Sequence, residues 1–257
     1  MMTASFRIVS LVPSLTELCF EIGLGPQMAG RTDFCISPPG AVEAVPSMGG
    51  PKTVDAAAFR AARPTHVLIS PEENARGILP LIAEAGAEAV LVHPLAPEDN
   101  RGMFVRFGAL FGRETEAAEL CRRLDAALAE AARVRAETPE IAVLPLIWKD
   151  PWVSVGRATY VAAMLDAVGL AVAPPGDGLY PRIADLPRAA AAADWVLLAT
   201  EPYLFDEGHA AALRGELGTP HVCLVTGESI AWYGSRVIAA LADLAALKRR
   251  LLAEESP

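Results

Sequence analysis

The strongest constraint in this 257-residue chain is that one order of apolar and amphipathic segments occurs twice. In each half, short apolar runs alternate with stretches of helical periodicity. Such runs, separated by amphipathic helices, are typical of parallel β-sheets with right-handed crossovers. The sequence therefore predicts an α/β fold with a duplicated design. The principal expected strands are residues 8–12, 66–70 and 90–92 in the first half and 141–147, 195–199 and 222–225 in the second.

The stretch between the two halves predicts a helical connection. Residues 113–136 contain neither Gly nor Pro and are rich in Ala, Glu, Leu and Arg. As one helix they would span roughly 36 Å, enough to cross from one lobe to the other. We expect an N-terminal lobe (1–112), a connecting helix (113–137) and a C-terminal lobe (138–257), with a ligand cleft between lobes that move little.

Composition excludes several classes of protein. The hydrophobic fraction of 53% is enough for real cores, and the net charge of -9 argues against nucleic-acid binding, which needs clustered Lys and Arg. The one dense basic run, 248–250, is expected to be a solvated helix end. The four cysteines are widely spaced and lack a C-x-x-C pair, so no disulfide framework is expected.

The first residues and the hydropathy of the chain indicate its cellular location. No basic and apolar leader precedes the expected strand at residue 8, and no uncharged apolar run reaches about 18 residues. These features predict a cytoplasmic protein without a membrane span, or a periplasmic or otherwise extracytoplasmic one if a leader was removed.

Candidate ligand-binding residues lie on loops after the expected strands, because ligands of parallel sheets bind beyond the carboxyl ends of the strands. Trp and Tyr on such loops offer stiff contact area for a planar or apolar ligand. The candidates are Ser14, Arg31, Thr32, Asp33, Glu73 and Asn74 in the first lobe and Trp148, Trp152, Tyr203, Trp232 and Tyr233 in the second.

Each candidate group also has a structural alternative. Ser14-x-x-Glu17 is the pattern of a helix capping box. Arg31 and Asp33 could form an internal salt bridge that shapes their loop, and the aromatic residues could cap the lobe cores. An acidic residue such as Glu72 could be solvated or could dock a partner.

Four common enzyme motifs are missing from the sequence. It contains no phosphate-binding loop, no dinucleotide fingerprint, no G-x-S-x-G elbow and no H-E-x-x-H. The four histidines never form an i, i+4 pair, and only His93 lies on a loop that follows a strand. A non-catalytic protein is expected.

Several segments resemble the helical-backbone (class III) substrate-binding proteins of ABC importers, the group that binds vitamin B12 and ferric siderophores. The likeness runs through nearly the whole chain in order and is greatest for the cobalamin-binding-like branch. The segments that carry it are 7–17 (RIVSLVPSLTE), 30–35 (GRTDFC), 45–50 (VPSMGG), 71–74 (PEEN), 148–152 (WKDPW) and 232–236 (WYGSR).

The resemblance implies two Rossmann-like lobes with a corrinoid or iron-chelate ligand between them and no intrinsic cofactor. It also implies a monomer that docks on the membrane subunit of an ABC importer through one acidic residue on each lobe. Glu72 or Glu73 could serve on the first lobe, and Asp206 or Glu207 on the second; we select Glu72 and Glu207. In this sequence Gly169-Leu170-Ala171 stands where many relatives have paired glycines.

Two other functions remain open on the sequence. A cytoplasmic cofactor-handling enzyme could reuse this fold, but metal-cluster ligation needs several thiols, and Cys35 is the only one expected near the cleft. A ligand sensor that reports to another protein is the second alternative.

Overall fold

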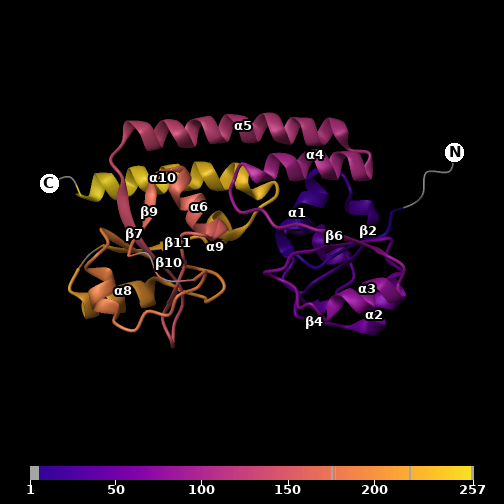
Figure 1. Ribbon diagram of the computed structural model, residues 1–257, viewed down its shortest axis with the longest axis horizontal. Helices are drawn as coiled ribbons and strands as arrows, with labels where there is room; N and C mark the ends of the chain where they lie inside the picture. Colours follow the sequence, from indigo (N-terminus) through magenta and orange to yellow (C-terminus); the bar gives the residue numbers. More distant parts are fainter. Residues whose placement is uncertain (1–5, 175, 177, 220, 256–257) are drawn as a thin grey trace. The chain divides into compact units, whose positions relative to one another are not determined.

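The computed structural model describes residues 6–174, 176, 178–219 and 221–255 and divides the chain into two compact units. The first unit contains the chain up to Pro94, residues Asn100–Arg122 and the segment Tyr233–Arg236. The second contains Leu95–Asp99, Arg123–Trp232 and the chain from Val237 onward. Each unit has its own parallel sheet and its own helices, as the α/β prediction requires (Figure 1).

The first unit is built on a four-stranded sheet in the order β2-β1-β5-β6, all parallel. Fully buried Val9 and Val67 lie on its central strands, and Phe59 packs against them from a helix. A short antiparallel hairpin, β3–β4, was not expected within the Pro- and Gly-rich loop. The strands are β1 (Ile8–Ser10), β2 (Met28–Arg31), β3 (Gly49–Gly50), β4 (Thr53–Val54), β5 (His66–Ile69) and β6 (Glu88–Leu91).

Helix α2, beside this sheet, begins at a local capping signal. The Asp55 carboxylate accepts the amides of Ala57 and Ala58 and so starts α2. The helices are α1 (Pro13–Glu21), α2 (Ala56–Ala62), α3 (Ile78–Glu84) and α4 (Asp99–Phe111), with single 3-10 turns at Gly25–Gln27 and Val42–Ala44.

The second unit repeats the topology of the first. Its parallel strands follow the order β9-β7-β10-β11, which corresponds strand for strand to β2-β1-β5-β6. The added strand β8 pairs antiparallel with β7. The duplicated order of the sequence is therefore a duplicated sheet. The strands are β7 (Ile141–Trp148), β8 (Val153–Ser154), β9 (Leu170–Val172), β10 (Trp195–Ala199) and β11 (Val222–Val225).

Three helices of the second unit, α6, α7 and α8, are also capped by side chains. Thr159 and Asp185 each accept an amide of the helix that follows, and Asp206 and His209 form a capping box. Gly218, in the left-handed region with a φ of 65°, ends α8. The helices are α6 (Tyr160–Ala167), α7 (Leu186–Ala190), α8 (Glu207–Leu217), α9 (Gly227–Ala231) and α10 (Arg236–Glu255).

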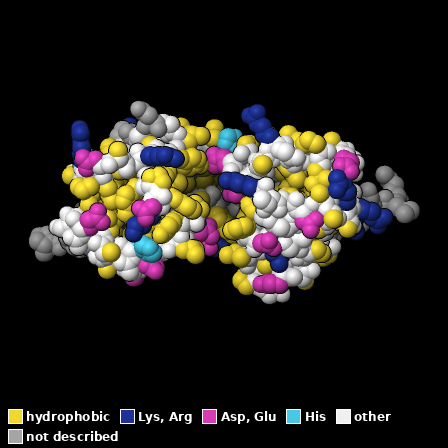
Figure 2. Space-filling view, turned by 90° about the horizontal axis from the view of Figure 1, so that it is seen from below, with side chains coloured by type: hydrophobic (Ala, Val, Ile, Leu, Met, Phe, Trp, Pro, Cys, Tyr) yellow, Lys and Arg dark blue, Asp and Glu magenta, His cyan; other side chains and the backbone are white. Residues whose placement is uncertain are grey.

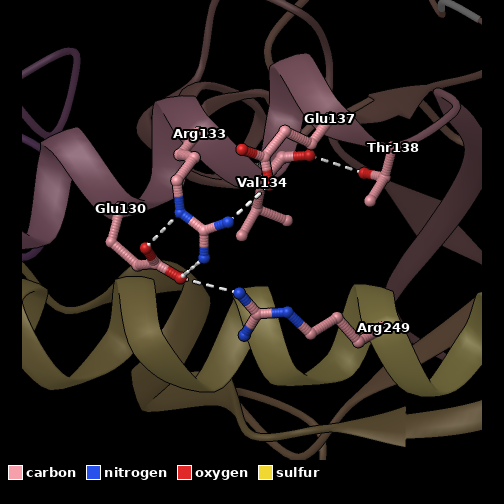
Figure 3. A network of polar contacts seen from close by, with 6 residues as sticks. All are labelled: Glu130, Arg133, Val134, Glu137, Thr138 and Arg249. Atoms are coloured by element: carbon pink, nitrogen blue, oxygen red, sulfur yellow. Dashed lines mark hydrogen bonds and ion pairs between the residues drawn. The ribbon is translucent and has the colours of Figure 1, made fainter.

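The expected connecting helix is a single unbroken helix, α5 (Glu114–Glu137). Its residues up to Arg122 belong to the first unit and the rest to the second. In the second unit a charged network joins α5 to α10 (Figure 3): Glu130 accepts from Arg133 and Arg249, and Arg133 also pairs with Glu137. The hydrogen bonds from Arg133 and Arg249 lower the pKa of Glu130 to about 2.

Among the described residues, no helix combines the length and the apolarity needed to span a bilayer.

The expected capping box at Ser14 and Glu17 is wrong. Helix α1 begins two residues earlier than expected, with Pro13 in its first turn and Val12 as its N-cap. Proline suits that position because its missing N–H would have no helical partner. Ser14 therefore lies inside the helix, and the Glu17 carboxylate is bound by Ser37 and Arg236 instead.

The expectation of a solvated helix end at 248–250 is wrong for Lys248, which has 0% exposure. Gly169 makes room for it: a Cβ on this glycine would lie 2.6 Å from the Lys248 Nζ. Gly169 directly follows the C-cap of α6, where a cation is favourable. Even so, burial lowers the pKa of Lys248, and nearby Arg135 lowers it further. The Nζ has no hydrogen-bond partner within the described part of the chain.

We expect Lys248→Met to stabilise the protein by about 1–3 kcal/mol at neutral pH, because it removes a desolvated amine and keeps the length of the side chain. The pKa of Lys248 is lower in the folded than in the unfolded state, so the unfolded protein binds more protons between the two pKa values. Wild-type stability from this group therefore rises with pH, and the advantage of Lys248→Met should shrink toward about pH 10.

Thermal unfolding followed by circular dichroism between pH 6 and 10 would measure this difference. Lys52→Met, at an exposed position, is the control and should change little. A Lys248→Met variant that is less stable than the wild type at every pH would show that the buried amine makes a net favourable contact.

Candidate functional site

In the first unit, Asn74 lies just beyond β5 and joins three segments at the carboxyl edge of the sheet. Its side-chain amide donates to the backbone oxygens of Leu11 (3.0 Å) and Pro51 (3.1 Å), and its Oδ1 accepts the Ser70 amide (2.9 Å). With only 9% of Asn74 exposed, these three bonds occupy its polar atoms. Asn74 therefore fixes the shape of this edge.

The candidates after β2 divide into buried and exposed groups. The Arg31 guanidinium donates to the backbone oxygens of Val42 and Thr32 at 2.9 Å each and so shapes its own loop. The alternative of a salt bridge between Arg31 and Asp33 is wrong. Thr32 is fully buried. The exposed Asp33 accepts a hydrogen bond from Ser47 at 2.5 Å. Only Arg31 and Asp33 of this group have surface available for a ligand.

Ser14 and Tyr233 belong to a second polar group at this edge. Burial raises the pKa of the Tyr233 phenol, and the neighbouring Ser70 and Ser14 oppose that shift. The half-buried Glu73 carboxylate also acts on this phenol, and its own pKa is raised by burial and by Glu72, against the effect of Lys52. The sequence places Tyr233 far from these residues, and folding brings it among them.

The segment Tyr233–Arg236 is fixed in the first unit by two strong contacts. The Gly234 amide donates to Asn100 Oδ1 at 2.7 Å, and Arg236 binds the Glu17 carboxylate through two nitrogens at 3.0 and 2.5 Å. Gly234 has a φ of 79°, and a Cβ there would lie 3.1 Å from the Ser14 backbone oxygen. Only glycine fits this position without strain.

In the second unit, four aromatic rings form a continuous group that we call the aromatic shelf: Trp148, Trp152, Tyr203 and Phe205. Trp148 meets Tyr203 edge to face at 5.5 Å, Tyr203 lies 4.5 Å from Phe205, and Phe205 stacks on Trp152 at 6.0 Å. The rings come from the carboxyl ends of β7 and β10: Trp148 ends β7, and Tyr203 lies on the segment that follows β10.

The aromatic shelf both caps the core and faces solvent. The two roles considered for these residues, contact with a ligand and capping of the lobe core, are therefore compatible. Phe205 is buried in the core cluster with Leu146 and Leu198, whereas Trp148 remains 42% exposed. Lys149 adds a cation 5.8 Å from the Trp152 ring. Figure 2 shows hydrophobic side chains gathered over the second unit, in the left half of the view.

Trp232 differs from the aromatic shelf, because only 9% of it is exposed. Its indole Nε1 donates to Glu201 Oε2 at 3.2 Å, which ties the end of α9 to the loop after β10. Trp232 therefore stabilises the second unit from within.

Four apolar residues near the predicted sites were not among the candidates from the sequence. Phe34 and Ile36 follow β2 with 62% and 53% exposure, and Leu204 is 80% exposed beside Tyr203. Phe205 completes the aromatic shelf. The aromatic candidates were Trp and Tyr alone. The missed residues could have been found in the sequence as Phe, Ile or Leu on loops that follow strands.

The acidic residues selected for partner docking are both on the surface. Glu72 lies 3.5 Å from His93, and Glu207 begins α8 and lies 3.5 Å from Arg214. Asp206 is the N-cap of that helix, so its carboxylate is engaged by His209. Of the two acidic candidates on the second lobe, Glu207 has the more accessible charge.

No grouping of three or more His, Cys, Asp or Glu suited to a metal ion occurs among the described residues. Cys35 is buried, and its sulfur contacts the hydroxyls of Thr16 and Thr32 at 3.1 and 3.2 Å. This thiol packs in the core of the first unit.

The model of the family described as periplasmic binding protein matches residues 8–212, well over half of the chain. The chain belongs to this periplasmic binding protein family. Its members bind solutes outside the cytoplasm and catalyse no reaction, so the prediction of a non-catalytic binding protein is confirmed. No curated protein sequence matches the chain.

Solved structures show the same fold over nearly the whole chain. The periplasmic heme-binding protein RhuT from Roseiflexus sp. RS-1 has a TM-score of 0.84 at 23% identity, covering 96% of this chain and 99% of that one. The vitamin B12 binding protein BtuF of Vibrio cholerae has a TM-score of 0.82 at 14% identity, with 96% and 97% covered. IsdE of S. aureus complexed with heme has a TM-score of 0.77 at 17% identity, with 94% and 98% covered.

These comparisons confirm the resemblance to the class III binding proteins of ABC importers and the bilobal α/β fold. At these identities the likeness to single structures concerns the fold. The chain is a solute-binding protein of the kind that serves ABC uptake, and its ligand is a small molecule.

We expect Glu17→Gln to destabilise the first unit by about 1–3 kcal/mol, because it leaves the half-buried Arg236 without its carboxylate. Thermal and urea unfolding would measure the loss. Glu119→Gln is the matched control, since Glu119 and Arg122 form a salt bridge that is largely exposed. Equal effects of the two substitutions would show that the Glu17–Arg236 pair contributes no more than a surface pair.

Proposed function

We propose that this protein captures a planar metal chelate, a corrinoid or a heme-type tetrapyrrole, for an ABC importer. The observation that carries this proposal is the aromatic shelf at the carboxyl ends of β7 and β10. Its support from the comparisons is that relatives of the same fold bind heme and vitamin B12. A ferric siderophore is the remaining iron chelate to be tested.

The aromatic shelf suits the face of a macrocycle. Trp148 and Leu204 offer exposed apolar surface, and burial of such surface contributes roughly 25 cal/mol per Å². The rings of the shelf already contact one another, so few side-chain rotamers would have to be ordered when the ligand binds. Lys149, beside Trp152, could pair with a carboxylate on the rim of a tetrapyrrole.

In the first unit, we propose that Arg31, Asp33 and Glu73 orient polar groups of the ligand. The buried candidates Ser14, Thr32 and Asn74 would act indirectly by holding the loops in shape. Trp232 and Tyr233 would do the same, each within its own unit. Phe34 joins the proposal as an apolar contact because it is exposed after β2.

The wider setting follows the family. We propose an extracytoplasmic location, a monomeric protein, and docking on the importer through the exposed carboxylates of Glu72 and Glu207. We also propose that residues 1–112 and 138–257 act as two lobes, with helix 113–137 as a stiff link.

Binding should be measured by titrating the purified protein with hemin, cyanocobalamin and a ferric hydroxamate siderophore, using tryptophan fluorescence and calorimetry. We expect saturable one-site binding of at least one tetrapyrrole with a Kd well below about 1 mM. A siderophore bound alone would replace the proposed ligand class, and no binding by the whole panel would refute the proposal.

Trp148→Ala should weaken binding of that ligand at least tenfold, equivalent to about 1.4 kcal/mol, because it removes an exposed ring of the aromatic shelf. Val105→Ala is the matched control: Val105 is 55% exposed on α4 in the first unit, outside every proposed contact. An affinity that Trp148→Ala leaves unchanged would exclude the aromatic shelf as the binding surface, even if the ligand class were right.

A further inference from the structure

The second unit has a pocket of about 440 Å³ that shares no residue with the aromatic shelf. Strand β11, helix α9 and helix α10 form its walls. Pockets for small molecules begin at about 300 Å³, so this one can hold a compact ligand. Its lining residues are Leu224, Val225, Thr226, Ser229, Asp243, Leu244, Ala246, Leu247 and Arg250.

Two opposite charges mark the ends of this pocket. Asp243 and Arg250 are seven residues apart on α10, which places them on the same face two turns apart, at an axial separation of about 10.5 Å. Within the described residues 221–255, these two side chains form no ion pair with each other. The Ser229 hydroxyl donates to Asp243 Oδ2 at 2.9 Å and fixes this carboxylate at one end.

Arg250 lies at the other end of β11, where its guanidinium contacts the side chain of Cys223. Its ion pair with Glu254 is long, at 3.9 Å, and both side chains are more than half exposed. Such a pair is weak and competes little with a bound anion.

Between the two charges the pocket is apolar. Leu224 and Val225 of the strand and Ala246 and Leu247 of the helix line this middle part. Charge at both ends and an apolar middle favour an elongated molecule with an ammonium group and a carboxylate. A simple anion would not use Asp243, and a fatty acid would place its chain against that carboxylate.

We propose that this pocket binds a short peptide of about three residues with free ends. Three extended residues span about 10 Å, which matches the separation of Asp243 and Arg250. The peptide ammonium would pair with Asp243 and its carboxylate with Arg250, while a central apolar side chain would lie between Leu224 and Leu247. The peptide would thus run parallel to α10 and antiparallel to β11, in the direction from Thr226 toward Cys223.

The test is titration of the full chain with alanyl-leucyl-alanine, followed by NMR chemical-shift changes and calorimetry. We expect saturable binding with a Kd at or below about 1 mM, weakened at least fivefold by Asp243→Asn and by Arg250→Gln. An N-acetylated peptide lacks the ammonium group that would pair with Asp243. It should therefore bind to the wild type and to Asp243→Asn with the same weak affinity. The same should hold for a C-amidated peptide and Arg250→Gln.

Two controls separate this site from the proposed chelate site. Arg249→Gln removes a neighbouring charge of α10 that pairs with Glu130, and Trp148→Ala alters the aromatic shelf; neither should change peptide affinity. No saturation up to about 10 mM would overturn the proposal. Equal binding of the doubly capped peptide, or loss of peptide binding in Trp148→Ala, would overturn it as well.

Discussion

The parallel arrangement of strands is the constraint on which the rest of this structure depends. The chain must return to the same end of the sheet before each new strand begins. The carboxyl ends of the parallel strands therefore all lie along one edge of the sheet. In the second unit this rule puts Trp148 after β7 and Tyr203 after β10 within 5.5 Å of each other. In the first unit it lets Asn74 join the segments that follow β1 and β5. Both candidate surfaces are consequences of strand direction.

A second requirement is that a segment distant in the sequence completes the first unit. Tyr233–Arg236 contributes a phenol beside Ser14 and Ser70 and an arginine on the Glu17 carboxylate. The contact depends on Gly234, because its backbone passes within van der Waals distance of α1. The C-terminal part of the chain is thus needed to finish the N-terminal unit, and the two units do not correspond to two uninterrupted halves of the sequence.

The two candidate surfaces differ in chemistry in a way that fits a binding protein. The second unit offers rings that are already packed against one another and a lysine at their edge. The first unit offers Arg31, Asp33 and Glu73, whose surroundings are set by buried hydrogen bonds. Rigid apolar contact surface and a few fixed polar groups are typical of sites that bind small ligands, which agrees with the family.

The sequence alone determined the alternation of strands and helices, its repetition and the continuous helix α5, since these follow from hydrophobic period and from the positions of Gly and Pro. It also indicated which loops follow strands, and therefore that Trp148, Tyr203 and Asn74 would lie near the carboxyl ends of strands. Only the tertiary structure decided what those side chains do. Asn74 and Thr32 are occupied or buried, Glu17 pairs with an arginine 219 residues away, and Lys248 enters the space left by Gly169. Local sequence carries no record of such contacts, because burial and partner choice depend on residues that only folding brings together.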